Sequence, residues 1–402
     1  MTAHTSDRLI LLSDAEYALR LERLQQAMAP AADGMLVTDN ANLYWLTGRV
    51  FAGYAYVPAQ GTALYGLRRC VHLEGPGVAA ERKIEDFAAR VAAECPAAGR
   101  LALEMDAASY AAVERARLAF AAQWPDVQAV SATGALRAVR AVKTPVQLEM
   151  MRLSGVRHEA VYRRIPRLYR PGMSDIELQV EIERLSRLEG CLGQFRVAGG
   201  EMELFMGSIL TGDNADAPSP YDFAMGGAGM DPSLPVGADG SVIRPGTTVM
   251  VDMNGDFTGY MTDMTRTFRL GAIAPEAERA HEVSRDICRR LAEAGRPGVQ
   301  ARDMYETALA MASEAGLEQY FMGHRQHAGF VGHGLGIEIN EAPVIAPRSR
   351  DVLREGMCIA LEPKFVIPGT GAVGIENTYV VRSEGPMECI TGAPEEIIDL
   401  EK

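Results

Sequence analysis

The chain has 402 residues, of which 48% are hydrophobic and 23% charged, as in an ordinary globular protein with room for more than one domain. Its formal net charge of −13 argues against nucleic acid or an anionic membrane as the main partner, because both bind basic surfaces. The six cysteines show no CxxC spacing, the N-terminus has too short an apolar stretch for a signal peptide, and no run approaches the ~18 apolar residues of a membrane span. We therefore expect a protein of the reducing cytoplasm.

The first part of the chain is expected to form an α/β unit. Residues 15–28 have the apolar spacing of a helix, and residues 34–48 (GMLVTDNANLYWLTG) read as a strand that runs into a turn. A second strand is expected at residues 100–106 and a helix at residues 108–123. This part contains no cluster of side chains that indicates chemistry.

A domain boundary is expected near residue 142. Thr144 and Pro145 form an N-cap followed by proline at the first helical position, so a long helix begins there. We therefore place an N-terminal domain at residues 1–142 and a second domain at residues 143–402.

The second domain mixes helices with strands. A helix capped by Ser174 or Asp175 is followed by a region rich in strands and glycine, including a loop at residues 224–240. Helices are expected again at residues 276–295 and 303–316. The segments MCIALEPKFVI and AVGIENTYVVR then read as strands rich in β-branched residues.

Two aspartates stand in a hairpin-like segment, VMVDMNGDFTGYMTDMTRTF, at residues 249–268. The segment reads as two strands joined by a turn around Gly255–Gly259, and symmetric pairing would put Asp252 directly opposite Asp263. Opposed Cβ atoms lie ~4.5–5.5 Å apart, so two carboxylates there repel each other unless a cation lies between them. The alternative is a hairpin whose aspartates face water.

Three more residues show a similar anomaly. Glu362 and Glu376 each lie inside an apolar, strand-like segment, although Lys364 could pair with Glu362. His333, in FVGHGLGIEI, is flanked by glycines that allow a close backbone approach. The GHGLG stretch lacks the strand-then-helix context of a phosphate loop, so it does not indicate nucleotide binding.

Taken together, the four acids and the histidine predict a metal centre. Two divalent ions would balance the four carboxylates, and a bridging hydroxide would leave one negative charge that a cation such as Arg266 could soften. Oxygen-rich ligation with one imidazole suits manganese, our first choice, or cobalt, zinc or iron. Metal ions ~3.5–4 Å apart generate a nucleophilic hydroxide and polarise a carbonyl group.

These motifs resemble the metal-binding segments of the pita-bread metallohydrolases, which include methionine aminopeptidase, aminopeptidase P, prolidase and creatinase. The resemblance covers residues 148–400, and its segments are VDMNGDFTGYMTDMTRTF, GHGLGIEINEAP, LEPKF and GIENTYVV. ANLYWLTG and KTPVQLEMMR add a resemblance to the creatinase, prolidase and aminopeptidase P branch. It implies an α/β (α+β) protein with a pita-bread catalytic domain and a smaller creatinase-type α/β N-terminal domain.

The resemblance also implies roles for individual residues. Asp252 would chelate one metal ion, Asp263 and Glu376 would bridge both ions, and His333 and Glu362 would complete the shell of the second. Glu362 would also shuttle protons. The family further implies a homodimer in which the N-terminal domain reaches the partner's active site.

Three positions depart from the family pattern. Peptidases of this family usually have histidines where this chain has Ser219 and Asn340. The prolidase and aminopeptidase P branch has another where this chain has Gly329, and His327 is close to that position but out of register. A missing imidazole removes a group that would stabilise the tetrahedral intermediate or protonate the leaving amine. Asn340 can still donate a hydrogen bond, so we keep Ser219 and Asn340 as candidate catalytic residues beside Glu362.

The sequence therefore predicts a metal-dependent hydrolase of a peptide-like C–N bond, of the Xaa-Pro dipeptidase or aminopeptidase type. The altered histidines leave an alternative open, a hydrolase of a small non-peptide amide or amidine like creatinase or the ectoine hydrolases. A catalytically inactive binding module is a third possibility, although such modules usually lose metal ligands. The expected substrate is a small peptide or small amide.

Overall fold

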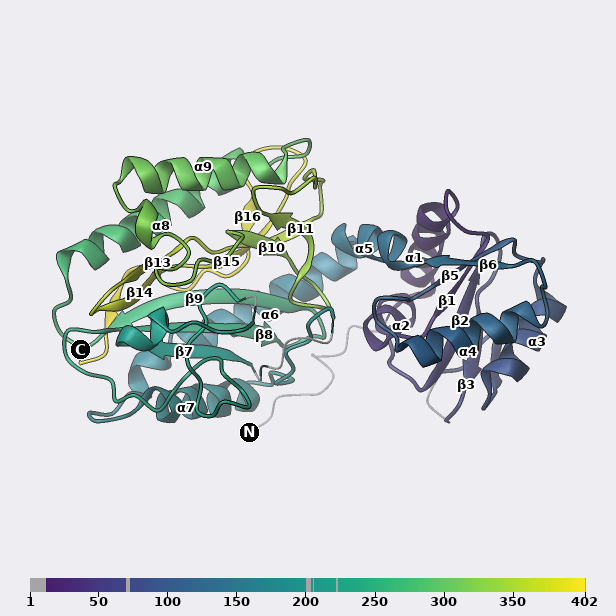
Figure 1. Ribbon diagram of the computed structural model, residues 1–402, viewed down its shortest axis with the longest axis horizontal. Coiled ribbons are helices and arrows are strands. Elements are labelled where there is room, and N and C mark those ends of the chain that lie inside the picture. Colours follow the sequence, from purple (N-terminus) through teal and green to yellow (C-terminus); the bar gives the residue numbers. More distant parts are fainter. Residues whose placement is uncertain (1–11, 70–72, 200–203, 205, 222, 402) are drawn as a thin grey trace. The chain divides into compact units, whose positions relative to one another are not determined.

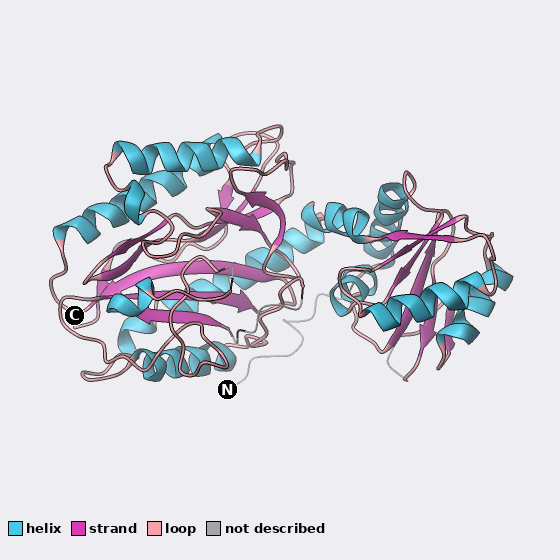
Figure 2. Cartoon of the chain, in the orientation of Figure 1, coloured by secondary structure: helices cyan, strands magenta, loops and turns pink. Residues whose placement is uncertain are grey.

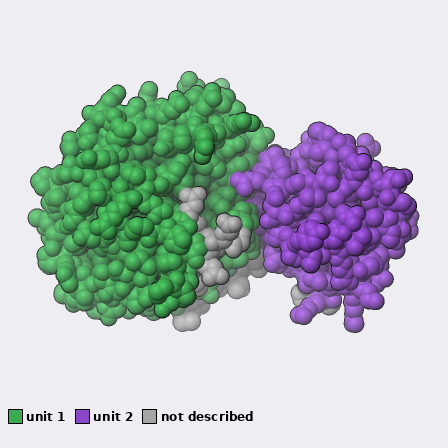
Figure 3. All heavy atoms as spheres, in the orientation of Figure 1, with its two compact units in different colours: residues 1–9, 141–402 green, residues 10–140 purple. Residues whose placement is uncertain are grey.

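The computed structural model describes residues 12–401 except 70–72, 200–203, 205 and 222. The chain divides into two compact units, and the boundary lies between Arg140 and Ala141 (Figure 3). Within the described part of the chain, no helix is both long and apolar enough to cross a membrane.

The N-terminal unit is a mixed sheet with helices packed on it (Figure 1). Its strand order is β4-β3-β2-β1-β5-β6, with β1 antiparallel to β2 and parallel to β5. The strands are β1 (Gly34–Val37), β2 (Gly53–Pro58), β3 (Leu64–Leu67), β4 (Val78–Ala80), β5 (Arg100–Leu103) and β6 (Gln128–Ser131). The helices are α1 (Asp14–Met28), α2 (Asn40–Thr47), α3 (Ile84–Glu94), α4 (Tyr110–Ala121) and α5 (Thr133–Ala141).

The turn expected after β1 is instead the helix α2. The Asp39 side chain caps this helix by accepting hydrogen bonds from the backbone N–H groups of Ala41 and Asn42. The helix ends at Gly48, whose φ of 70° is the left-handed conformation of a glycine C-cap. Both ends of this short helix are therefore fixed by residues that we had interpreted as turn formers.

The larger unit has two sheets, a two-stranded ribbon and helices (Figure 2). Its helices are α6 (Pro145–Tyr162), α7 (Asp175–Leu188), α8 (Pro275–Ala294) and α9 (Ala301–Glu314), with short 3-10 turns at Ile165–Arg167, Gly212–Asp216 and Glu318–Tyr320. The strands of one sheet, in the order β17-β9-β8-β7, are β7 (Gly207–Thr211), β8 (Thr248–Asp256), β9 (Met261–Arg269) and β17 (Ile398–Asp399). The second sheet has the order β11-β10-β12-β15-β16 and comprises β10 (Gly332–Gly334), β11 (Glu341–Ile345), β12 (Cys358–Leu361), β15 (Asn377–Val380) and β16 (Glu388–Cys389). The ribbon pairs β13 (Lys364–Ile367) with β14 (Gly371–Gly374).

The helices of the larger unit lie outside the strands, as Figure 1 shows. Helices α6 and α7 pack on the β7–β8–β9 sheet, while α8 packs on the β13–β14 ribbon and α9 on β11. Thr144 caps α6 and Ser174 caps α7, each in a capping box, which confirms the two expected N-caps. The strands in the middle are buried nearly throughout, so a polar side chain on them lies in the interior.

The register of β8 and β9 differs from the symmetric pairing that we expected. Asp252 pairs with Thr265, and Asp263 pairs with Asn254, so the expected pairing is wrong by two residues. Gly255 remains inside β8, and the turn is at residues 257–260, where Asp256 Oδ1 accepts a hydrogen bond from Gly259 N at 2.8 Å. A two-residue shift keeps both aspartates on one face of the sheet, diagonally placed.

Glu362 and Glu376 lie at two places where a continuous strand was expected but the strand is interrupted. Glu362 and Pro363 separate β12 from β13, and Ile375 and Glu376 separate β14 from β15. In both places the backbone passes between the second sheet and the ribbon. The carboxylates are therefore carried by bends between strands.

The expected loop at residues 224–240 has turns and irregular backbone. Asn214 accepts a hydrogen bond from Ala228 N at 2.8 Å and donates one to Gly237 O at 3.0 Å. Asp175 accepts hydrogen bonds from Asp239 N and Gly240 N. These buried side chains hold the loop at both its middle and its end.

Candidate metal centre

The fold brings together the five residues that the sequence analysis singled out. Ligand atoms of Asp263, His333 and Glu376 lie within 4.8 Å of one another, and so do ligand atoms of Asp252, Glu362 and Glu376. Glu376 belongs to both groups and therefore connects them. Their residues come from two sheets and the two bends between strands.

Neighbouring polar groups fix these acids in place. Thr265 Oγ1 donates to Glu376 Oε2 at 2.7 Å, and the backbone of Glu376 forms a bridge with that of Thr265. Thr378 Oγ1 accepts a hydrogen bond from the backbone N–H of Asp263 and donates to its carbonyl oxygen. The β9 strand and the start of β15 are thereby joined beside the acid cluster.

His333 presents one ring nitrogen to the acids. Nδ1 lies 3.2 Å from the carbonyl oxygen of Gly334, which can only accept, so Nδ1 carries the proton of that hydrogen bond. Nε2 lies 3.3 Å from Glu362 Oε1 and 3.8 Å from Asp263 Oδ2. A backbone carbonyl that orients the imidazole in this way is a usual companion of a metal-binding histidine.

Lys364 is a buried cation that contacts three of the acids. Its Nζ donates to Asp252 Oδ2 at 2.9 Å, to Glu362 Oε2 at 2.7 Å and to Glu376 Oε2 at 3.2 Å, and the residue has no exposed surface. From the sequence, this lysine was expected only as a possible partner of Glu362. Its wider role could have been inferred from its place inside an apolar strand, because a buried lysine must find its counter-charges in the interior.

Arg266 does not have the role that we expected. Its guanidinium donates to the carbonyl oxygens of Thr265, Glu376, Thr391, Ala393 and Pro394 and to the side chain of Asn377. The arginine thus binds the backbone behind the cluster and contacts none of its carboxylates in the described structure.

The pKa values in the cluster are displaced strongly and in opposite directions. Burial, followed by repulsion from Asp252, raises the pKa of Asp263 to about 7, and burial also raises that of Glu376. Burial would raise the pKa of Glu362 too, but the Lys364 ammonium and His333 lower it to about 2. Burial would lower the pKa of His333, but Glu362 and Asp263 raise it to about 9. Asp263 and Glu376 are therefore the carboxylates whose charge the cations of the cluster compensate least.

A family model for metallopeptidase family M24 matches residues 149–383, which include all five residues of the cluster. The chain belongs to metallopeptidase family M24. A second model, the creatinase/prolidase N-terminal domain, matches residues 20–142. These matches confirm the resemblance read from the motifs, and with the solved structures below they confirm the expected fold class.

Known M24 relatives share the architecture at moderate identity. A protein named probable dipeptidase PepE, from Mycobacterium tuberculosis, is 29% identical over 270 residues, which cover 67% of this chain and 63% of that protein. An uncharacterized peptidase of Bacillus subtilis, YqhT, is 26% identical over 390 residues, 95% of this chain and all of that protein. An Xaa-Pro dipeptidase from Bacillus anthracis superposes with a TM-score of 0.76 at 25% identity, covering 95% of this chain and 99% of the other. The prolidase of Pyrococcus horikoshii OT3 superposes with a TM-score of 0.75 at 20% identity, covering 94% and 100%.

Membership of the M24 family implies divalent metal ions, and the donor atoms of this chain fit them. Glu362 Oε1 and Glu376 Oε1 are buried and have no hydrogen-bond partner. Both share a ligand group with Asp252, and Glu376 also shares one with Asp263 and His333. Buried carboxylate oxygens without a partner are costly unless a cation binds them.

The positions of the missing family histidines have other uses in this M24 chain. Asn340 accepts a hydrogen bond from Ala198 N at 2.7 Å and donates to Ala198 O at 3.3 Å, so its amide holds a neighbouring segment. Ser219 Oγ donates to Pro235 O at 2.8 Å, and Ser219 lines a cavity of about 200 Å³ together with His327. A Cβ at Gly329 would have nothing within 4 Å, so there is space for a side chain.

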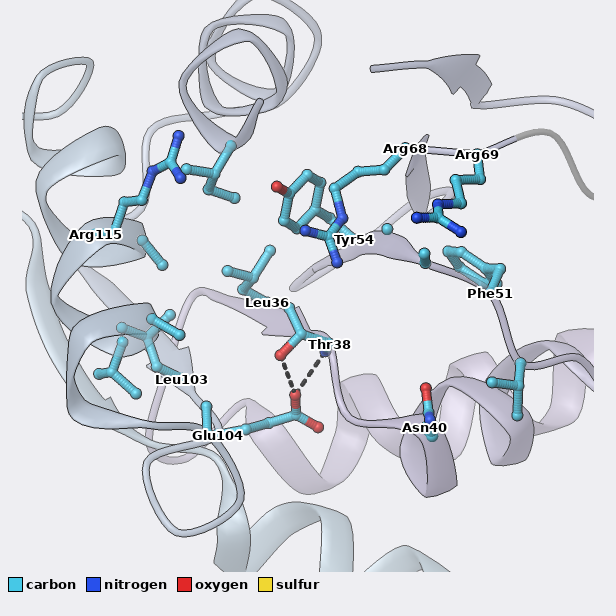
Figure 4. Close-up of a pocket in the computed structure, with 18 residues that line it drawn as sticks. Leu36, Thr38, Asn40, Phe51, Tyr54, Arg68, Arg69, Leu103, Glu104 and Arg115 are labelled. Carbon is cyan, nitrogen blue, oxygen red and sulfur yellow. Dashed lines mark hydrogen bonds between the residues drawn. The ribbon is translucent and has the colours of Figure 1, made fainter. Parts of the chain in front are cut away.

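A larger cavity, of about 670 Å³, lies in the N-terminal unit. Figure 4 shows Arg68, Arg69 and Tyr54 on one side of it and Arg115 on another. Glu104, at its base, accepts hydrogen bonds from Thr38 and neighbouring groups of the same unit. None of the five cluster residues lines this cavity.

Proposed function

We propose that this protein is a metal-dependent hydrolase of a peptide-like C–N bond, of the Xaa-Pro dipeptidase type. The observation that carries the proposal is the cluster of four carboxylates and one imidazole, with its unpartnered glutamate oxygens, inside an M24 domain. The M24 relatives that bear the names dipeptidase and Xaa-Pro dipeptidase support the choice of a small peptide as substrate.

The residues of the cluster would have two roles, metal binding and proton transfer. Asp252, Asp263, His333, Glu362 and Glu376 would hold the metal. Bound divalent metal supplies a nucleophile at neutral pH and polarises the scissile carbonyl. Glu362 is proposed to carry a proton to the leaving nitrogen, because its carboxylate lies within the cluster and its buried Oε1 has no hydrogen-bond partner.

Other features of the proposal rest on the chemistry of the chain and on the family resemblance. Manganese is proposed as the native metal because four carboxylates and a single imidazole form an oxygen-rich ligand set. A cytoplasmic location is proposed because the cysteines that the structure describes are all free. A homodimer is proposed from the resemblance to the creatinase and prolidase branch, and light scattering after gel filtration would test it.

The second candidate function is hydrolysis of a small non-peptide amide or amidine. It is favoured by Ser219 and Asn340, which replace family histidines and bind backbone groups of this chain. Peptide turnover would then lack the imidazoles that assist it. The inactive binding module stays a third proposal, opposed by the five intact positions.

A substrate panel tests these functions. The manganese-loaded protein is assayed for proline release from Ala-Pro and Leu-Pro and, in parallel, for turnover of creatine and ectoine-type compounds. We expect proline release that falls at least ~100-fold in Asp263→Asn, because a metal ligand is lost. Asp213→Asn is the matched control, since this exposed carboxylate only accepts a hydrogen bond from Gly369 N.

Each outcome decides between the candidates. Turnover of the small amides without proline release would replace the peptidase by the second function. A protein that binds metal but turns over neither class would be the binding module. Equal activity in Asp263→Asn and Asp213→Asn would contradict the assignment of the active site.

A further inference from the structure

Lys364 occupies a position inside the candidate centre that a metal ion would otherwise take. Its ammonium donates to oxygens of Asp252, Glu362 and Glu376, the same three residues that form one of the two ligand groups. The contact distances of 2.7–3.2 Å use one N–H bond for each carboxylate. No other acceptor of Nζ is found among the described residues.

The two glutamates are divided between this ammonium and the other ligand group. Glu362 and Glu376 both give Oε2 to Lys364, and both keep a buried Oε1 without a hydrogen bond. Glu362 Oε1 lies 3.3 Å from His333 Nε2, on the side of the cluster that Asp263 also lines. The carboxylate oxygens that remain available to bind a metal ion therefore lie on the His333 side of the cluster.

We propose that the Lys364 ammonium replaces one of the two divalent ions, so that the centre binds a single ion at Asp263, His333 and Glu376, with Glu362 Oε1 beside them. The inference rests on the proposed function, because it concerns the metal of the same site. The centre would then hold one divalent ion and the Lys364 ammonium in place of the expected pair of divalent ions.

Geometry, and not total charge, distinguishes one ion from two. With the lysine included, one divalent ion leaves the cluster one charge negative and two ions leave it one charge positive. A second ion that used the oxygens of Asp252, Glu362 and Glu376 would stand against the ammonium in a dry interior, where charges repel strongly. The displaced ammonium would then be buried without an acceptor, because Lys364 has no exposed surface.

Metal counting tests the proposal independently of activity. The purified full-length protein is stripped with a chelator, loaded with excess Mn²⁺, passed through a desalting column and analysed by plasma mass spectrometry. We expect one equivalent in the wild type and two in Lys364→Met, in which the fixed cation is gone. Electron paramagnetic resonance should show an isolated six-line Mn²⁺ signal in the wild type and a spin-coupled pair in the variant.

Lys143→Met is the matched control. Lys143 is also buried and forms an ion pair of 2.9 Å, but its partner is Glu341, outside the cluster. This variant should keep one equivalent. If Lys364→Met fails to fold, the wild-type count and its spectrum decide the question alone.

The outcomes separate this inference from the proposed function. Two equivalents and a coupled spectrum in the wild type would overturn the inference and leave the metal-dependent hydrolase intact. One equivalent in both wild type and Lys364→Met would overturn the role of the lysine. No bound manganese in either protein, with no proline release, would overturn the metal-dependent function and the inference together.

Discussion

The imidazole of His158 lies where a side chain of residue 255 would otherwise stand. A Cβ placed on Gly255 would lie 2.5 Å from His158 Cγ and 2.6 Å from Nδ1. The ring itself is held edge-on to Tyr162, with centroids 4.9 Å apart, and Nδ1 contacts Thr262 Oγ1 at 3.1 Å. Helix α6 therefore approaches strand β8 closely only because residue 255 has no side chain.

Gly255→Ala should lower the free energy of unfolding of the larger unit by ~1–3 kcal/mol, since the packed imidazole cannot move aside. Urea unfolding followed by far-UV circular dichroism measures this, because Trp45 and Trp124 both lie in the N-terminal unit and their fluorescence does not report on the larger one. Gly329→Ala serves as control and should stay within ~0.5 kcal/mol, as its Cβ meets nothing within 4 Å. Equal effects in the two variants would refute the close-approach explanation.

His158 should make the protein sensitive to acid. Complete burial lowers the pKa of its imidazole to about 3, below the value of about 6.5 expected in the unfolded chain. The unfolded state then binds more protons below pH 6.5, so stability falls as the pH falls from 6.5 toward 3, by up to ~1.4 kcal/mol per pH unit.

Between pH 7 and pH 5, His158→Gln should therefore lose ~2 kcal/mol less stability than the wild type. Glutamine can keep a hydrogen bond to Thr262 but does not titrate. Urea titrations of both proteins at the two pH values measure the difference, and groups common to both cancel. Parallel losses in the two proteins would show that His158 is not the acid-sensitive group.

Arg266→Lys should destabilise the larger unit although it keeps the positive charge. The guanidinium donates to five backbone carbonyls and one side chain, and a lysine ammonium cannot reach them all. We expect a loss of ~2–5 kcal/mol from the buried acceptors left unpaired. Arg152→Lys, at a half-exposed pair with Glu388, is the control and should change stability by under ~1 kcal/mol.

Removal of metal should lower the thermal stability of the larger unit. Without divalent metal, the four carboxylates of the cluster are balanced in part by the Lys364 ammonium and the His333 imidazole. A metal ion present at 100 times its Kd adds ~2.7 kcal/mol to the stability. Addition of Mn²⁺ to chelator-treated protein should raise the Tm by ~5–10 °C in differential scanning fluorimetry. Asp263→Asn should show little of this rise, and a Tm indifferent to chelator would speak against a metal bound in the interior.

Much of the candidate centre could be predicted because its members are chemically conspicuous. Charged residues such as Glu362 and Glu376 inside apolar segments must be compensated in the interior, and the motif spacing indicated how. The bends between strands that carry these two glutamates could not be predicted from the sequence, because β-branched residues favour extended backbone on both sides of a bend.

The errors share a physical cause, which is that a residue type has more than one use. Gly255 was interpreted as a turn former, yet it provides room for His158, and the hairpin register followed from that mistake. Asp39 was read as part of a turn but caps a helix. Lys364 pairs with Glu362 as considered, but Arg266 does not soften the charge of the acids, since only the folded backbone decides which cation reaches the carboxylates and which reaches the carbonyls.

The ligand residues are carried by elements on both sides of the larger unit's interior, with Asp252 and Asp263 in one sheet and His333 in the other. A cation coordinated by Asp263 and His333 would join the two sheets. Amide hydrogens of β9 and β10 should then exchange with solvent together, slowly when the metal ion is bound and faster after a chelator has removed it.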